Sequence, residues 1–301
     1  MIRLGLCCKF FEQPINFRTA TVSHLMKIKS KGQDYKKYLR DIIDSNIKAL
    51  DASIEFCSLH DIGCFRINSE FFPAITHELT KYTLEEFEDF QSLLDGLQVC
   101  RKKAKDKNIR LTMHPSQFIL LSSPNDEVTE KAIADLNYHA YLSDLVGGDV
   151  INIHMGGGYG DKKSAVERVV KNFDKLKPEV QSKLTFENDD KIYSPVEVFE
   201  VCMRLKIPFV YDVHHHRCLK DEFSIEEATE KAILTWNREP LFHISSPIDG
   251  YEAKNSRPHH DYININDFPL FWKKISPLTV EVEAKAKEAA IFKLQKDLSN
   301  I

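Results

Sequence analysis

The sequence predicts a (β/α)8 barrel, the TIM-barrel fold of the α/β class. Short apolar segments alternate eight times with longer segments that have helical spacing. The short segments are almost continuously hydrophobic, which is typical of parallel strands covered on both faces. A barrel of this kind takes about 250 residues plus insertions, and the chain has 301 residues. We therefore expect a single domain over residues 1–301, with a doubly wound open sheet as the competing fold.

The expected strands are recognised by their length and their apolar residues, and several of the expected helices have end signals. Thr83 and Glu86 form a capping box at the start of the second helix, and Ser194 precedes Pro195 at the first position of the fifth. Gly147 stops the third helix. The strands are expected at residues 2–7, 64–68, 110–114, 150–154, 183–188, 208–213, 241–245 and 278–284. The helices are expected at residues 35–61, 84–107, 126–146, 164–176, 195–205, 225–236, 267–275 and 285–298.

Composition excludes membrane and disulfide-stapled classes. Hydrophobic residues make up 43% of the chain and charged residues 29%, which is typical of a globular protein. No apolar leader follows the first three residues, and no apolar stretch has the length of a membrane span. The seven cysteines are an odd number without paired spacing, so we expect reduced thiols and a cytoplasmic location. We also expect a monomer. We interpret the adjacent Cys7 and Cys8 as packing residues.

The distribution of charge matters more than its sum. The formal net charge of −4 argues weakly against a nucleic-acid partner. Between Lys9 and Arg40, however, eight basic residues face only Glu12 and Asp34. A local basic surface of this kind suits contact with phosphates, and the alternative is an ordinary solvated helix face.

Imidazole and carboxylate side chains end six successive predicted strands. In chain order they are His114, His154, Glu187, Asp212, His243 and Glu283. Barrel active sites form at the C-terminal ends of the strands. One such histidine can be a packing residue, but six polar residues in phase are not explained by packing, and converging carboxylates require cations between them.

The residue types at this rim indicate divalent metals. Imidazole and carboxylate ligands without thiolate suit zinc or manganese. There are too many ligands for one ion, and two or three neighbouring metals are typical of phosphoester hydrolysis. His215, three residues after Asp212, lies just beyond its strand, so the two can serve neighbouring metals.

Two loops on the same rim have side or main chains suited to nucleic acid. The glycine-rich loop around Gly157 can bring backbone N–H groups to a phosphate, although a flexible turn is the plainer interpretation. Gln117 and Phe118 follow His114, and an exposed amide and aromatic ring can bond to and stack on bases.

At these positions the chain resembles the ultraviolet damage endonucleases. The matching motifs, in order across nearly the whole chain, are FRINS at 65–69 leading to His77, HPSQF at 114–118, NIHMGG at 152–157, FENDD at 186–190, DVHH at 212–215, HISS at 243–246, HHDY at 259–262 and EAK at 283–285. The resemblance implies a xylose isomerase-like, endonuclease IV-like TIM barrel. It also implies a hydrolase that acts on double-stranded DNA containing ultraviolet lesions. Such an enzyme nicks immediately 5′ of cyclobutane pyrimidine dimers and 6-4 photoproducts, leaving a 3′-hydroxyl and a 5′-phosphate, with two or three divalent ions, commonly manganese.

The resemblance also implies roles for individual residues. It assigns Glu187 as a bridge between two metals, His114 and His154 to the first site, Asp212, His243 and Glu283 to the second, and His215 and His259 to the third. His77 is expected close to the cluster, and His260 is the adjacent alternative to His259. Gln117 and Phe118 resemble the pair that wedges into the duplex opposite the lesion.

Three positions depart from the family pattern. Leu241 stands where family members usually have a lysine, so a metal-bridging carbamate cannot form there. Phe118 replaces a frequent tyrosine and keeps the ring without the hydroxyl, and Leu6 replaces another tyrosine. These changes concern metal occupancy and lesion preference rather than the class of protein.

Three other functions compete with this interpretation. An apurinic/apyrimidinic endonuclease uses the same barrel and chemistry on a different lesion. A metal-dependent sugar isomerase usually needs a lysine near its metals and fewer histidines than this rim has. A metal-binding barrel without catalysis is disfavoured by the intact carboxylates. Incision assays on irradiated, abasic and intact duplexes, beside a sugar-isomerisation assay, distinguish the four.

Overall fold

Eight parallel strands close into a barrel in the order β1 to β8 in this computed structural model, which describes residues 2–301. The strands are β1 (Ile2–Cys7), β2 (Cys64–Ile67), β3 (Arg110–Met113), β4 (Val150–His154), β5 (Leu184–Glu187), β6 (Phe209–Asp212), β7 (Leu241–Ile244) and β8 (Leu278–Val282). The first and last strands pair directly, with Ile2 beside Leu278 and Leu6 beside Val282. The predicted fold class is therefore confirmed, and each strand lies within two residues of its predicted bounds.

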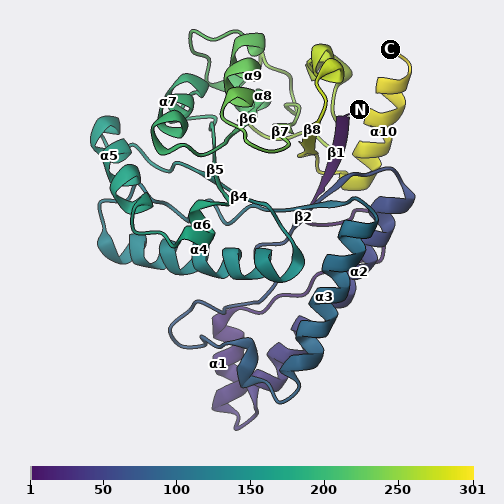
Figure 1. The fold of residues 1–301 in the computed structure, drawn as a ribbon, viewed down its shortest axis with the longest axis vertical. Coiled ribbons are helices and arrows are strands. Elements are labelled where there is room, and N and C mark those ends of the chain that lie inside the picture. Colours follow the sequence, from purple (N-terminus) through teal and green to yellow (C-terminus); the bar gives the residue numbers. More distant parts are fainter. Residues whose placement is uncertain (1) are drawn as a thin grey trace.

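Helices surround the barrel, and one part of the chain extends away from it. The helices are α1 (Val22–Ser30), α2 (Tyr35–Leu59), α3 (Phe90–Asp106), α4 (Asp126–Val146), α5 (Lys162–Phe173), α6 (Pro178–Gln181), α7 (Pro195–Leu205), α8 (Val213–Cys218), α9 (Ile225–Leu234) and α10 (Lys287–Ser299). Short 3-10 turns are η1 (Leu84–Glu86), η2 (Ile265–Asp267) and η3 (Leu270–Lys274). Helix α1 lies outside the barrel beside the ends of α2 and α3 (Figure 1). No helix within residues 2–301 combines the length and the apolar character needed to cross a bilayer.

Two predicted helices are wrong in their extent. The expected helix 84–107 is interrupted, because buried Phe87 adopts an extended backbone after η1 and α3 begins only at Phe90. The capping box of Thr83 and Glu86 is present, but it caps the short turn. The expected helix 267–275 is two 3-10 turns separated near Pro269, whose backbone is extended. Helices α1, α6 and α8 were not predicted.

The interior of the barrel is polar toward the C-terminal ends of the strands. Alternate strand residues point inward, and the buried polar ones that face each other include Arg66, Thr112, Asn152, Thr185 and Glu281. Nearer the other end, an apolar cluster contains Val150, Val210 and Leu241. The main hydrophobic core lies between the strands and the surrounding helices. All seven cysteines are free thiols, and Cys7 is buried while Cys8 has a left-handed backbone with φ of 64°.

Candidate metal centre

The strand ends bring six polar side chains to one rim. His154 and Glu187 are the last residues of β4 and β5 and are directly paired in the sheet. Asp212 ends β6 and pairs with His243 of β7. His114 and Glu283 directly follow β3 and β8. Because the strands are parallel and in register, these side chains converge inside the C-terminal mouth of the barrel.

Glu187 lies at the centre of this cluster. Its Oε2 atom lies 3.1 Å from His114 Nε2 and 4.0 Å from His154 Nε2. Its Oε1 atom lies 3.1 Å from His243 Nδ1 and 3.3 Å from His215 Nδ1. One buried carboxylate is therefore surrounded by four imidazoles that come from four strands or strand ends.

Three sets of side chains within residues 2–301 have ligand atoms close enough to hold an ion. They are His114 with His243 and Glu283, His114 with His154 and Glu187, and Glu187 with Asp212 and His215, each with atoms within 4.8 Å of one another. Glu187 belongs to two of the sets. Asp212 lies with Glu187 and His215, whereas the resemblance implied a site shared with His243 and Glu283.

Unsatisfied atoms in the cluster fit divalent cations. Among the described residues, Glu187 Oε1, Asp212 Oδ2 and His243 Nδ1 are buried and make no hydrogen bond of suitable geometry, although Glu187 Oε1 lies 3.1 Å from His243 Nδ1. A buried polar atom without a partner is costly, and the cost is larger for a charged one. Divalent cations supply the missing partners for imidazole nitrogens and carboxylate oxygens at once. The donor set therefore fits a multi-metal centre.

Hydrogen bonds behind the ligands fix their orientation. Asn152 Nδ2 donates to Glu187 Oε2 over 2.5 Å, and the Thr185 hydroxyl donates to Asn152 Oδ1 over 2.9 Å. The backbone N–H of His215 donates to Asp212 Oδ1 over 2.7 Å, because Asp212 caps α8. Such supporting contacts hold ligand atoms in place for a metal.

Backbone carbonyls also select the histidine tautomers. His114 Nδ1 lies 3.1 Å from the carbonyl of Pro115, and His215 Nδ1 lies 2.9 Å from that of Asn188. A carbonyl accepts only, so Nδ1 is the donor in each of these contacts, and Nε2 is the nitrogen that a bound cation would use as a ligand.

Arg66 and Glu281 are functional-site residues that the sequence analysis missed. Arg66 Nε donates to Glu281 Oε2 over 2.6 Å and Nη1 donates to Glu283 Oε1 over 2.6 Å. His243 Nε2 lies 3.0 Å from Glu281 Oε2 and 2.9 Å from Arg66 Nη2. Both residues are buried. Their charged groups contact Glu283 and His243 from inside the barrel and hold these two candidate ligands in place. Glu281 lies two residues before Glu283, and this strand periodicity was the signal that could have placed it.

Burial and charge shift the ionisation of the cluster in opposite directions. Burial raises the pKa of Glu187, but His243 and His154 outweigh it and hold that pKa well below its usual range. Burial lowers the pKa of His243, but Glu187 outweighs it and raises the pKa to about 10. Without metal, a proton on His243 therefore offsets the charge of Glu187, and a bound cation has to displace that proton.

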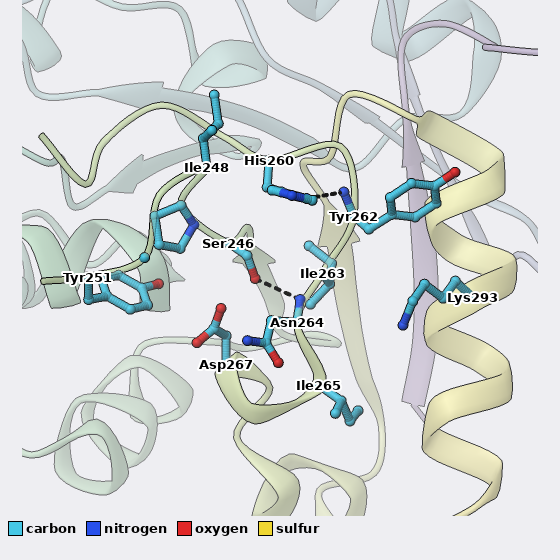
Figure 2. A pocket seen from close by; sticks show the side chains of 12 residues that line it. Ser246, Ile248, Tyr251, His260, Tyr262, Ile263, Asn264, Ile265, Asp267 and Lys293 are labelled. Carbon is cyan, nitrogen blue, oxygen red and sulfur yellow. Dashed lines mark hydrogen bonds between the residues drawn. The ribbon is translucent and has the colours of Figure 1, made fainter. Parts of the chain in front are cut away.

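The remaining predicted histidines fall in different places. His259 Nδ1 lies 3.8 Å from Glu283 Oε2, and its ring neighbours His215. His260 instead lines a separate cavity of about 590 Å³, where its Nδ1 accepts the backbone N–H of Tyr262 over 2.9 Å (Figure 2). The geometry therefore favours His259 over His260, although His259 belongs to none of the three ligand sets. His77 is exposed, accepts the backbone N–H of Leu79, and is not brought into any of the three ligand sets.

A cavity of about 550 Å³ opens beside the cluster and is lined by the predicted DNA-contacting residues. Gln117, Phe118 and Gly157 border it together with His154 and His215. Phe118 is 74% exposed, so its ring is not packed into the barrel rim. The exposed ring faces solvent next to the candidate ligands.

The basic run between Lys9 and Arg40 is partly neutralised. Lys36 pairs with Glu86, and Arg40 pairs with Asp89, which lie outside the run in sequence. Because these partners fold against α2, that part of the run is an ordinary paired surface. Lys9 lies elsewhere, at the barrel rim.

Leu241 is fully buried at the start of β7 and contacts Val150 and Val210. It points into the barrel below His243, because side chains two residues apart share a strand face. The position that usually holds a lysine in other family members is therefore occupied here by part of an apolar layer of Leu241, Val150 and Val210.

Fold and site together define a class, the TIM barrels with a candidate multi-metal centre at the C-terminal rim. The family model described as UV-endonuclease UvdE matches residues 2–301, and the chain belongs to this family. A UV DNA damage endonuclease of Bacillus cereus (strain Q1) is 32% identical over 295 residues, which cover 94% of this chain and 90% of that protein. The crystal structure of SacUVDE superposes with a TM-score of 0.88 at 26% identity, covering 100% of this chain and 99% of that one. Endonuclease IV from Thermus thermophilus shares the fold, with a TM-score of 0.60 at 13% identity over 99% and 100% of the two chains.

Proposed function

We propose that this protein is a divalent-metal-dependent endonuclease that nicks double-stranded DNA immediately 5′ of ultraviolet photoproducts, leaving a 3′-hydroxyl and a 5′-phosphate. The observation that carries the proposal is the Glu187 cluster, with buried ligand atoms that lack partners, in a chain of the UV-endonuclease family. Manganese is the proposed metal, with zinc or magnesium as alternatives, because the ligands are imidazoles and carboxylates without thiolate.

When bound, the metals would supply an activated water and neutralise the leaving oxygen of a phosphodiester. Glu187 would hold two ions, with His114 and His154 at one and Asp212 and His215 at another. His243 and Glu283 would complete the cluster beside His114. Asn152 and the α8 N-terminus keep the two central carboxylates in place during the reaction.

Arg66 and Glu281 would position the ligands rather than contact DNA. The guanidinium is shared between Glu281 and Glu283, and Glu281 also holds the Nε2 side of His243. This leaves His243 Nδ1 directed at Glu187. Arg66 thus also balances carboxylate charge at the bottom of the site, so fewer cations are needed to neutralise it.

Recognition of the lesion would use the exposed rim loop. A damaged dinucleotide stacks and pairs poorly, so moving it out of the duplex costs less than moving normal bases. Phe118 and Gln117 border the cavity next to the ligands and are free to occupy the space left behind. The exposed pair Gln117 and Phe118 therefore favours an activity on damaged DNA over an activity on a sugar, because binding a sugar does not require residues that enter a duplex.

The test is manganese-dependent incision of an oligonucleotide duplex that carries one defined photoproduct, mapped to the nucleotide. We expect a single nick 5′ of the lesion with wild-type protein and none with Glu187→Gln. Matched duplexes with an abasic site or no lesion serve as substrates for the competing activities. Preferential cutting at the abasic site would assign the protein as an apurinic endonuclease, and no incision with measurable sugar isomerisation would overturn the proposal.

A further inference from the structure

A second rim cavity lies beside the candidate metal centre. It has a volume of about 470 Å³ and is bordered by Lys9, Lys285 and Lys287, with Arg66 and Glu283 on the side facing the metal ligands. We call it the lysine pocket. His259 borders both this pocket and the cavity of Gln117 and Phe118. Both cavities therefore adjoin the candidate metal centre at His259.

The lysine pocket has an excess of positive charge. Four cationic side chains border it, against the single carboxylate of Glu283, which is already bonded to Arg66. Over residues 2–301, the ammonium groups of Lys9, Lys285 and Lys287 form no ion pair or hydrogen bond. Lysines elsewhere are often paired, as Lys103 is with Asp51 and Lys162 with Glu197. Unpaired ammonium groups around one cavity repel one another, and an anion bound between them would remove that repulsion.

The backbone under these lysines is held in place. The buried carboxylate of Glu288 accepts the backbone N–H groups of residues 11, 12 and 13 over 2.8, 2.7 and 3.2 Å. Glu288 directly follows Lys287, and residues 11–13 closely follow Lys9, so one side chain ties both segments together. The backbone N–H of Lys285 donates to the carbonyl of His260 over 3.1 Å. The backbone that carries the three lysines is therefore held in place around one cavity. This reduces the conformational entropy that is lost when an anion binds.

We propose that the lysine pocket binds a backbone phosphate of the nicked strand, next to the phosphate held at the metal centre. This inference rests on the proposed function and adds the subsite that holds the continuing strand. A DNA backbone phosphate and inorganic phosphate offer the same oxygen acceptors, so the experiment includes both. Lysine ammonium groups suit either as point charges.

The experiment compares wild type with the variant Lys9→Gln/Lys285→Gln/Lys287→Gln. The matched control is Lys171→Gln/Lys175→Gln/Lys177→Gln, which removes three exposed lysines from the last turn of α5 and the connection from α5 toward β5. Binding of a duplex with one cyclobutane dimer is measured against salt concentration without divalent metal. The logarithm of the binding constant falls linearly with the logarithm of the salt concentration, and losing one phosphate contact should make this slope shallower by about 0.9. The ratio of wild-type to variant affinity should therefore fall about eightfold for each tenfold rise in salt. The control should keep the wild-type slope.

A scan with single neutral methylphosphonates locates the contact. At one position beside the nick, the neutral linkage should weaken binding by wild type but not by the lysine-pocket variant. The inference is overturned if the variant keeps the wild-type salt slope while wild type still incises the lesion duplex. It is also overturned if the variant loses affinity for inorganic phosphate but keeps the wild-type methylphosphonate profile. Absence of incision by wild type contradicts the proposed function instead. Equal melting temperatures establish that the variants are folded.

Discussion

Replacing Phe118 with alanine should weaken binding to damaged DNA while leaving the fold intact. The ring is 74% exposed, so only about a quarter of its burial energy is at stake in the free protein. Full burial of a phenylalanine stabilises by about 1.5–3 kcal/mol. The expected loss of stability is therefore below about 1 kcal/mol, which for a chain of this size lowers the melting temperature by roughly 2–4 °C at most.

The expected loss of affinity is larger than this loss of stability. Stacking of a base on an aromatic ring contributes about 1–3 kcal/mol, which corresponds to roughly a tenfold to hundredfold change in Kd. The loss should be confined to duplexes with a lesion, because only there are bases moved out of the stack. Phe118→Tyr keeps the ring and should bind almost as wild type does. Metal content should be unchanged in both variants.

The assay measures melting temperature and affinity for damaged and undamaged duplexes in parallel. Leu234→Ala is the matched control, since Leu234 is 71% exposed at the end of α9, on the opposite face of the barrel. It should change neither affinity. If Phe118→Ala lost affinity equally for both duplexes and melted several degrees lower, the wedge role would be refuted.

Three further predictions concern the barrel interior. Glu187→Gln should lose more metal by elemental analysis than Glu283→Gln, because Glu187 contributes to two ligand sets and Glu283 to one; equal losses would contradict a bridging role. Activity at fixed pH should not depend on added bicarbonate, since the buried Leu241 cannot form a carbamate, and marked stimulation would disprove this. Burial raises the pKa of Glu281, but Arg66 and His243 outweigh it and hold the pKa at about 2, against about 4.3 in an unfolded chain. Glu281 should therefore stabilise the metal-free fold by about 3 kcal/mol above pH ~4.3, and this contribution should fade toward pH 2. Urea unfolding at pH 6 and pH 3 should show a smaller pH effect in Glu281→Gln than in wild type, and an equal effect would count against the Arg66 pairing.

The strands were predictable because their signal is local. A short run of apolar residues buried on both faces is visible in the sequence without knowledge of its neighbours. The helix 84–107 failed for the opposite reason. Its break depends on Phe87 entering the core and on Arg40 of α2 donating to Asp89, contacts that periodicity does not reveal. Helix α1 is short, and its only clear signal was Thr21 as an N-cap.

The candidate ligands were predictable because barrel topology converts strand ends into a common rim. The sequence could not show which ligands share an ion. Asp212 is grouped with Glu187 and His215 because Asp212 caps α8, and this turn brings His215 next to it. Arg66 and Glu281 were missed because a charged residue within a buried strand has no local signature. Their pairing joins strands β2 and β8 across 215 residues of sequence. The exposure of Phe118, likewise, is a property of the folded loop.

The Glu288 contact has a consequence for the order in which the protein is completed. Residues 11–13 leave the ribosome well before their acceptor Glu288, which is 275 or more positions later in the chain. Strand β1 also cannot complete its pairing until β8 has been synthesised, because the pairing of β1 with β8 closes the barrel. During translation, the N-terminal loop that borders the rim therefore has no final anchor until α10 emerges. A chain shortened before residue 288 would lack the contacts of α10 with β1 and the hydrogen bonds from residues 11–13 to Glu288. Even a truncation late in the chain should therefore destabilise the fold.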